Sequence, residues 1–174
     1  MKQLDSTGLK RLHREWRRRS TSRVALVIDS VQSPYNLGAI VRTAAAYRVD
    51  HLWVAGTTPE PAAKAVGKVA LGTERYLTWT VVGQAVDGVV AAREVGYAVL
   101  ALELCDGATP LHEVALSTST CLVIGNEDHG VAANALAASD GCAYLPQLGR
   151  VGSLNVATAT AIAIYELRRR EFTS

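Results

Sequence analysis

The chain has 174 residues, of which 49% are hydrophobic and 20% charged, enough for one domain with a hydrophobic core. No run of 18 apolar residues occurs, so we expect no transmembrane helix, and no apolar stretch of a secretory signal follows the basic start. Three widely spaced cysteines, Cys105, Cys121 and Cys142, predict free thiols in a reducing cytosol rather than disulfides or a zinc site. We therefore expect a cytoplasmic protein.

The net charge of +2 conceals an asymmetry between the start of the chain and the rest. Residues 1–23 carry a net charge of +6, so the other 151 residues sum to −4. A basic segment on a mildly acidic body indicates a local contact with a polyanion, and a solvated helix face is the alternative. We divide the chain into a basic N-terminal helical extension, residues 1–23, and a main domain, residues 24–174.

Helical and strand-like segments alternate along the chain. In chain order, we expect a helix at Gly8–Arg19, a strand at Val24–Ile28, a helix at Leu37–Tyr47, a strand at His51–Ala55, a helix at Pro61–Val69, a short strand at Tyr76–Thr80, a helix at Gln84–Val95, strands at Tyr97–Leu102 and Thr120–Gly125, a helix at Val131–Ala138, a strand at Cys142–Leu145 and a helix at Leu154–Arg170. The strands are rich in Val, Ile and Leu without clean alternation, as in strands covered on both faces. This order predicts a single α/β domain with a mostly parallel sheet flanked by helices.

Three loops after predicted strands mix glycine or proline with polar residues: Asp29–Arg42, Gly125–Gly130 and Leu145–Asn155. Ligands of such sheets bind where loops leave the carboxyl ends of the strands, so we expect the functional site there. The chain has no dinucleotide glycine fingerprint and no P-loop motif, which argues against an oxidoreductase or a nucleotide hydrolase. It also lacks a metal-binding motif and a Gly-x-Ser-x-Gly elbow, so we expect no metal and no serine hydrolase.

The three loops resemble, in order and spacing, the three motifs of SpoU-type RNA 2′-O-ribose methyltransferases of the SPOUT superfamily. The matching stretches are SPYNLGAIVRTA at 33–44, VIGNEDHG at 123–130 and LPQLGRVGSLNVA at 145–157, and the similarity runs from about Val24 to Arg170. The resemblance implies a C-terminal deep trefoil knot, S-adenosyl-L-methionine as cofactor, RNA as substrate and a homodimer. It implies methyl transfer to a ribose 2′-hydroxyl without a metal ion.

The resemblance assigns roles to particular residues. The catalytic positions that it implies are Asn36, Arg42, Glu127, Ser153 and Asn155. The cofactor-binding positions that it implies are Leu102, Gly125, Leu145 and Leu154. Plainer interpretations exist for several of them: Asn36 and Ser153 can cap the helices that follow, Glu127 can favour a helix dipole and Arg42 can form a surface ion pair.

The substrate is predicted from the N-terminal extension. Only about 23 residues precede the first strand, too few for the separate RNA-binding domain of many ribosomal RNA enzymes of the family, which favours tRNA over ribosomal RNA. On a helical wheel Lys10, Arg14, Arg17 and Arg18 are neighbours, and Leu9, Leu12 and Trp16 form an apolar side. We therefore predict an RNA contact through Arg14, Arg17, Arg18 and Arg19.

Two further expectations concern assembly and activity. The stretch Leu154–Tyr165 is apolar almost all round, which predicts a helix buried on more than one side, in a twofold dimer. A ribosomal RNA enzyme and an inactive RNA-binding relative remain the alternatives. Departures from the family pattern at Arg48, Gln147, Ala157 and Thr158 concern packing and substrate fit more than the reaction.

Overall fold

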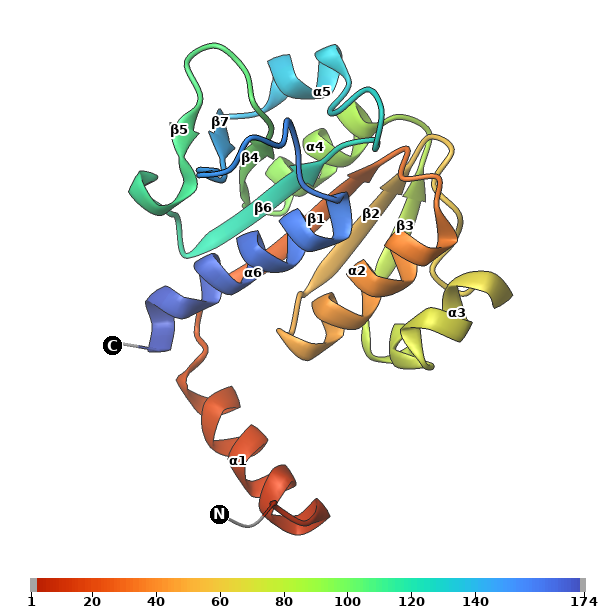
Figure 1. Ribbon diagram of the computed structural model, residues 1–174, viewed down its shortest axis with the longest axis vertical. Helices are drawn as coiled ribbons and strands as arrows, with labels where there is room; N and C mark the ends of the chain where they lie inside the picture. The colour runs from red at the N-terminus through yellow and green to blue at the C-terminus, as the bar shows by residue number, and fades with distance from the viewer. Residues whose placement is uncertain (1–2, 173–174) are drawn as a thin grey trace.

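The computed structural model describes residues 3–172 and contains a sheet of seven strands in the order β3-β2-β1-β6-β4-β7-β5 (Figure 1). All six strand pairs are parallel. The strands are β1 (Arg23–Asp29), β2 (His51–Ala55), β3 (Trp79–Val82), β4 (Ala98–Leu102), β5 (Thr109–Pro110), β6 (Ser119–Ile124) and β7 (Gly141–Tyr144). The helices are α1 (Ser6–Arg19), α2 (Pro34–Ala46), α3 (Lys64–Ala70), α4 (Ala85–Glu94), α5 (Ala133–Ala138) and α6 (Val156–Phe172), with short 3-10 turns η1 (Thr73–Tyr76) and η2 (Leu111–Glu113).

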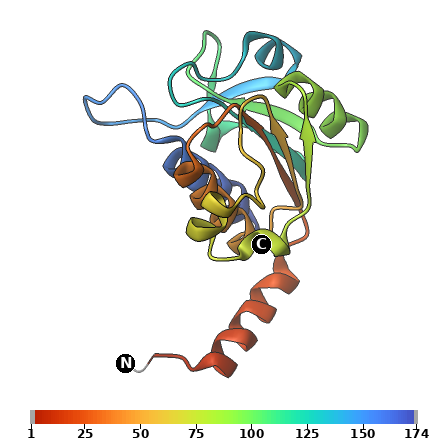
Figure 2. The same cartoon turned by 90° about the vertical axis from the view of Figure 1, so that its right-hand side faces the viewer.

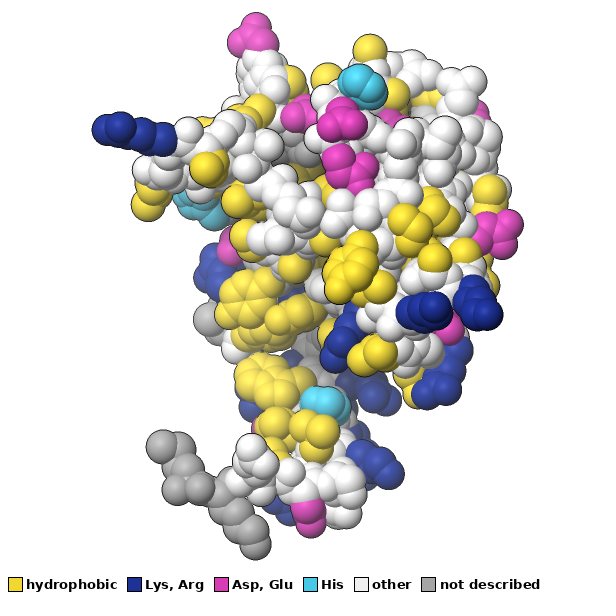
Figure 3. All heavy atoms as spheres, turned by 45° about the vertical axis from the view of Figure 1, so that its right-hand side comes forward, with side chains coloured by type: hydrophobic (Ala, Val, Ile, Leu, Met, Phe, Trp, Pro, Cys, Tyr) yellow, Lys and Arg dark blue, Asp and Glu magenta, His cyan; other side chains and the backbone are white. Residues whose placement is uncertain are grey.

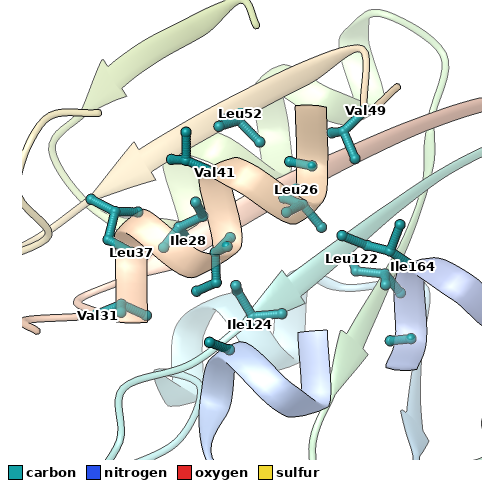
Figure 4. Close-up of a cluster of buried hydrophobic side chains, with 14 of the residues drawn as sticks. Leu26, Ile28, Val31, Leu37, Val41, Val49, Leu52, Leu122, Ile124 and Ile164 are labelled. Atoms are coloured by element: carbon teal, nitrogen blue, oxygen red, sulfur yellow. The ribbon is translucent and has the colours of Figure 1, made fainter. Parts of the chain in front are cut away.

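Helices cover both faces of the sheet, as the apolar strands require. Buried residues of α2, α3 and α6 pack on one face, where Leu26, Ile28, Leu122 and Ile124 of the central strands meet Ile164 of α6 (Figure 4). Residues of α4 and α5 pack on the other face. Figure 2 shows the sheet between these two layers. The predicted α/β class with a mostly parallel sheet is confirmed.

The sequence placed most elements within two or three residues of their observed bounds, with two differences. A strand was expected at Tyr76–Thr80, but Tyr76 ends η1 and the edge strand β3 spans Trp79–Val82. The two-residue strand β5 was not expected, because Thr109–Pro110 is too short for any periodic pattern. Neither difference moves a motif.

The position of α6 is fixed by a buried arginine. Arg168 is 3% exposed and donates to the carbonyl oxygens of Tyr47 at 3.0 Å, Arg48 at 2.6 Å and Ser22 at 2.9 Å. It also pairs with Glu171 at 2.8 Å. Burial of the Glu171 carboxyl raises its pKa, but hydrogen bonds from Ser22 and Arg168 outweigh this and hold the pKa at about 2. These bonds tie the C-terminal half of α6 to the end of α2 and the start of β1.

The N-terminal helix α1 lies apart from the sheet (Figures 1 and 2). It buries none of its residues, and Leu9, Leu12 and Trp16 remain 45%, 38% and 40% exposed. The expected apolar side is therefore present, but within residues 3–172 its aromatic contact with the main domain is the edge-on packing of Trp16 against Phe172 at 5.2 Å.

The cysteines differ from the sequence expectation. Cys105 and Cys142 are paired as a disulfide between the loop after β4 and strand β7, whereas three free thiols were expected. Cys121 is buried and free, and its burial raises the pKa of its thiol. Widely separated positions in the chain gave no sign that Cys105 and Cys142 meet.

No helix among residues 3–172 is long and apolar enough to cross a membrane.

Candidate functional site

The three motif loops meet at the carboxyl edge of the sheet. They leave the ends of β1, β6 and β7, which lie close together because the strand order places β6 beside β1 and β4 between β6 and β7. A cavity of about 690 Å³ opens at this edge. Its walls come from the loop after β4, the second motif loop, the third motif loop and the first turns of α6.

The first loop is shaped by the start of α2. Ser33 caps this helix, since its hydroxyl accepts a hydrogen bond from the Asn36 backbone nitrogen at 3.4 Å, and Pro34 occupies the first helical position. The alternative interpretation of Asn36 as the cap of α2 is therefore wrong. Asn36 lies in the first turn, so its side chain is free to point toward the second loop.

The start of α6 shows the same kind of difference. Asn155 caps this helix, because its side-chain oxygen accepts from the backbone nitrogens of Ala157 at 3.0 Å and Thr158 at 3.2 Å. Ser153, which was a candidate cap, lies two residues earlier in the loop, is exposed and lines the cavity. The amide nitrogen of Asn155 is thereby left to bond elsewhere.

A chain of hydrogen bonds joins the three loops. Asn155 Nδ2 donates to Asn36 Oδ1 at 3.0 Å, and Asn36 Nδ2 donates to Glu127 Oε1 at 2.7 Å. Each asparagine accepts with its oxygen and donates with its nitrogen, so all the bonds run in one direction and end on the carboxylate. Asn36 is 91 positions from Glu127 and 119 positions from Asn155 in the chain, and these two bonds hold the three side chains together.

The carboxylate of Glu127 is held in its charged form. Partial burial raises its pKa, but hydrogen bonds from the Asn36 side chain and from backbone nitrogens, including that of Gln32 at 3.4 Å, outweigh burial and lower the pKa. A carboxylate with a lowered pKa is a weak proton acceptor at neutral pH. The position of the Glu127 carboxylate suits a different role, that of fixing the orientation of the Asn36 side chain.

The second loop is a tight turn closed on itself. The backbones of Asn126 and Gly130 are paired in an antiparallel bridge, with hydrogen bonds of 2.9 and 3.0 Å. The side-chain oxygen of Asn126 accepts from the backbone nitrogens of Asp128 and His129, and its amide donates to the Ser30 carbonyl at 2.7 Å. Gly130 has a φ of +68°, a conformation that glycine adopts without steric cost. The loop therefore presents a fixed backbone to the cavity.

Two carboxylates that the sequence analysis did not single out bind the backbone directly after this loop. Asp29, 6% exposed at the end of β1, accepts from the Ala132 backbone nitrogen at 2.8 Å. Glu103, directly after β4, accepts from the backbone nitrogens of Val131 at 3.1 Å and Leu104 at 2.9 Å. The available signal was their position at the edge where the loops meet: Asp29 ends the buried strand β1, and Glu103 directly follows β4.

The structure brings together most of the residues that the sequence selected. The four predicted cofactor positions all line the cavity: Leu102, Gly125, Leu145 and Leu154. Asn36, Glu127 and Asn155 form the hydrogen-bond chain at its rim, and Ser153 lies in its wall.

Arg42 stands apart from this group. It is exposed on α2, six residues after Asn36, which corresponds to a rise of about 9 Å along the helix. No hydrogen bond or ion pair joins Arg42 to another residue within 3–172, and it does not line the cavity. Its guanidinium is therefore available to a bound molecule outside the cavity.

No group of three or more His, Cys, Asp or Glu side chains in the described range is arranged to hold a metal ion. The polar groups at the site are side-chain amides, the Ser153 hydroxyl, carboxylates and backbone groups, which suit an organic ligand and a polar substrate.

Comparison with known proteins gives a family for this arrangement. Residues 23–165 match the model of the SpoU rRNA Methylase family, so the chain belongs to that family. It is 31% identical over 150 residues to the tRNA (guanosine(18)-2′-O)-methyltransferase of Escherichia coli K12, covering 84% of this chain and 63% of the relative. It is 36% identical over 150 residues to the 23S rRNA (guanosine(2553)-2′-O)-methyltransferase of Bacillus subtilis, covering 86% of this chain and 59% of the relative.

The fold agrees with a solved structure of the same kind. The AdoMet-bound rRNA methyltransferase of Sinorhizobium meliloti superposes with a TM-score of 0.79 at 29% identity, over 85% of this chain and 56% of that one. The chain thus spans about three fifths of the length of these relatives. The resemblance drawn from the three motifs is confirmed.

The Asn36–Glu127 contact predicts a pH effect. Asn36→Asp places a second carboxylate against Glu127, and two carboxylates this close cannot both ionise readily, so the folded-state pKa of the pair rises. A carboxyl pair whose pKa is higher in the folded state stabilises the protein at pH values below the unfolded-state pKa of about 4. This stabilisation is lost as the pH rises through the folded-state pKa. Relative to wild type, we expect the variant's melting temperature to fall by several degrees between about pH 4 and pH 7.

Asn134→Asp is the matched control, because Asn134 donates to the neutral side chain of Gln84 at 3.0 Å. Thermal unfolding of both variants across this pH range is the measurement. Parallel pH profiles for the two variants would contradict the predicted contact.

Proposed function

We propose that this protein transfers a methyl group from S-adenosyl-L-methionine to the 2′-hydroxyl of a ribose in a structured RNA. The observation that carries the proposal is the hydrogen-bond chain Asn155–Asn36–Glu127, which joins all three motif loops at the rim of one cavity. The names of the relatives support it, since those from Escherichia coli and Bacillus subtilis are both RNA 2′-O-methyltransferases.

The cavity fits the proposed cofactor. Its volume of about 690 Å³ suits a small organic ligand, and its walls combine leucine side chains with backbone of the second and third loops. A side chain at Gly125 would meet the backbone of Gly130 and Val131, so only glycine leaves the second loop closed as it is. We propose that Leu102, Gly125, Leu145 and Leu154 hold the cofactor, which supplies an electrophilic methyl group on a sulfonium.

The residues at the rim would position the ribose and its hydroxyl. We propose that Asn36, Ser153 and Asn155 orient the nucleotide by hydrogen bonds, with Glu127 fixing Asn36. Holding the two reactants in line is worth up to about 7–11 kcal/mol of the barrier when the geometry is ideal, and neither reacting atom needs a metal.

The 2′-hydroxyl must also lose its proton. Glu127 is a weak acceptor because its pKa is lowered and its oxygens are already bonded. A guanidinium stays protonated in proteins, so Arg42 suits a different task, holding a phosphate of the RNA or stabilising negative charge on the attacking oxygen. We assign proton acceptance to a phosphate oxygen of the RNA or to water.

Arg42→Ala tests this division of labour. We expect methyl transfer to fall at least about 100-fold, a typical loss for one donor to developing charge, while calorimetry shows unchanged cofactor affinity because Arg42 lies outside the cavity. Arg93→Ala on α4, on the opposite face of the sheet, is the control and should retain activity. Near-normal turnover by Arg42→Ala would exclude Arg42 from the reaction.

For the substrate we propose tRNA, with ribosomal RNA as the competing candidate. Support comes from the Escherichia coli relative, whose name specifies tRNA, while the Bacillus subtilis relative acts on 23S rRNA. Parallel assays with labelled cofactor, on unmodified tRNA and on ribosomal RNA, separate the two. Cofactor binding without methylation of either RNA would favour an inactive relative.

We propose that α1 forms a separate RNA-binding extension of the domain. Arg14, Arg17 and Arg18 are exposed and in no ion pair within the described chain. Arg19 pairs with Glu15 at 3.2 Å and lies over the Trp16 ring at 4.7 Å. Cations of this kind bind phosphates with an affinity that does not depend on sequence and falls with salt.

Replacing Arg14, Arg17, Arg18 and Arg19 together by alanine should weaken RNA binding and flatten its salt dependence. We expect a loss of up to about 0.7–0.9 unit of log–log slope for each phosphate contact removed, measured by RNA titration at several salt concentrations. Cofactor affinity serves as the internal control and should not change. An unchanged slope would mean that these charges only solvate the helix.

We propose a homodimer in which α6 contributes to a twofold interface. One side of α6 is buried in the chain, and Ile162 and Tyr165 on another side are 44% and 45% exposed. The apolar side of α1 is also uncovered, and Figure 3 shows hydrophobic side chains gathered where α1 meets the main domain. Uncovered apolar surface of this extent favours a partner, and a twofold axis would bring the same surface from both subunits together.

Sedimentation at micromolar concentration should therefore give the mass of a dimer. Ile162→Asp should shift the mass toward the monomer, whereas Val90→Asp, at a 49% exposed position of α4, should leave the dimer intact. A monomeric wild-type protein would refute the proposal.

Two further properties complete the proposal. The chain crosses from β6 to β7 on the far side of β4 and returns to pack α6 against α2, a path that supports the deep trefoil knot implied by the family. The relatives' RNA substrates support a cytoplasmic location for this protein.

A further inference from the structure

A second group of cations lies on the main domain, away from α1. We define the α3–η1 patch as the exposed side chains Lys64, Lys68, Leu71, Arg75 and Tyr76. Figure 3 shows Lys and Arg side chains gathered on the lower part of this face, while most Asp and Glu side chains lie above them. The patch is therefore a basic surface of the body itself.

The charges of the patch are not neutralised by carboxylates. Within residues 3–172, no ion pair involves Lys64, Lys68 or Arg75, whereas Arg93 and Arg169 elsewhere on the surface are paired at 2.9 and 2.8 Å. Glu74, the carboxylate within η1, is half-buried and turns one oxygen into the interior. The outward charge of the patch is consequently positive.

The spacing aligns these side chains on one side of the segment. Lys64 and Lys68 are four residues apart on α3 and lie on the same face of the helix, with Leu71 one further turn along. The Cβ atoms of two lysines one helical turn apart are about 5–6 Å from each other, so both ammonium groups can reach neighbouring phosphates of one nucleic-acid strand.

An aromatic ring stands beside the cations. Tyr76 is 68% exposed, and the Arg75 guanidinium lies 4.8 Å from its ring centre and donates to its hydroxyl at 2.8 Å. The contacts with Arg75 therefore fix the Tyr76 ring, although most of its surface is exposed. Aromatic rings of this kind bind unpaired bases by stacking, without regard to base identity.

The patch is rigidly connected to the helix that carries Asn36 and Arg42. A Cβ atom at Gly38 of α2 would lie 2.6 Å from Val69 Cβ and 2.9 Å from the Val66 carbonyl oxygen of α3, so the two backbones touch at this glycine. Gly38 is two residues from Asn36. Tyr35 and Arg42, seven residues apart on α2, share an exposed face beside α3, and Tyr35 is 75% exposed.

From this placement we propose that the α3–η1 patch is a second RNA-binding surface, which holds a strand of the substrate RNA next to the target nucleotide. Lys64 and Lys68 bind consecutive phosphates, Tyr76 stacks on an unpaired base and Arg42 continues the cationic path toward Asn36. The inference rests on the proposed RNA substrate and adds where that RNA lies. Because α3 packs directly on α2, RNA bound here would be at a fixed offset from the rim of the cavity.

The experiment measures binding of bulk tRNA by the full-length protein at several salt concentrations. Lys64→Ala/Lys68→Ala should weaken binding on the order of tenfold and reduce the log–log salt slope by about 1.4–1.8 units, as expected for two lost phosphate contacts. Tyr76→Ala should weaken binding about fivefold or more without changing the slope, since it removes stacking and no charge. Tyr76→Phe and Tyr76→Trp keep a ring and should bind like wild type.

The single variants Lys64→Ala and Lys68→Ala each remove one cation from the patch. Arg93→Ala removes one cation from α4 on the other face of the sheet and is their control. The lysine variants should raise KM for RNA with kcat and cofactor affinity unchanged. Wild-type binding and slope in Lys64→Ala/Lys68→Ala would overturn the inference, as would equal losses in Arg93→Ala. The inference would also be overturned if Lys64→Ala/Lys68→Ala lost binding to anionic lipid vesicles but still bound RNA like the wild type.

The binding assay does not depend on methyl transfer. Wild-type protein that binds RNA through the patch but methylates none would remove the proposed function and leave the RNA-binding surface standing. Lys64→Ala/Lys68→Ala protein that binds and methylates RNA like the wild type would remove only the proposed role of the patch.

Discussion

The site depends on a one-way chain of hydrogen bonds between side chains that are far apart in the sequence. Asn155 is fixed by capping α6, and its amide then reaches Asn36, whose amide reaches Glu127. At the two middle positions each asparagine amide accepts with its oxygen and donates with its nitrogen, whereas an ionised carboxylate or an apolar residue there would break the chain. This explains why asparagine stands at both positions and a carboxylate at the end.

The rest of the structure keeps the three loops within reach of this chain. Parallel strands bring the loops to one edge, Asp29 and Glu103 hold the backbone after Gly130, and Asn126 ties the second loop to the first. On the other side, buried Arg168 fixes α6 against α2 and β1. Loops are usually the mobile part of a fold, and here several side-chain bonds to backbone nitrogens restrain them.

Much of the fold could be predicted because its central strands are buried on both faces. Continuous apolar runs marked β1, β2 and β6 to within a residue or two, and the alternation with helices gave the parallel sheet. The half-exposed edge strand β3 and the two-residue β5 carry no such pattern, and they were shifted or missed. The pairing of Cys105 with Cys142 depends on tertiary packing and has no local signal.

The sequence selected most of the residues that lie together at the cavity, but it did not predict how they are bonded to one another. Both loops that precede helices contain two good capping residues, and Pro34 at the first helical position was the overlooked signal that Ser33 caps α2. At α6, Ser153 and Asn155 compete, and only the path of the loop decides for Asn155. The supports at Asp29 and Glu103 were missed because a carboxylate after a strand is common on protein surfaces, and its partners lie elsewhere in the chain.

The most direct test is to identify the atom that receives the methyl group. Unmodified RNA is incubated with the protein and isotopically labelled S-adenosyl-L-methionine, digested to nucleosides and analysed by mass spectrometry. The account predicts a single labelled nucleoside whose methyl group fragments with the ribose, and its loss in Asn36→Ala. A methyl group that fragments with the base, or no transfer by protein that binds both cofactor and RNA, would contradict it.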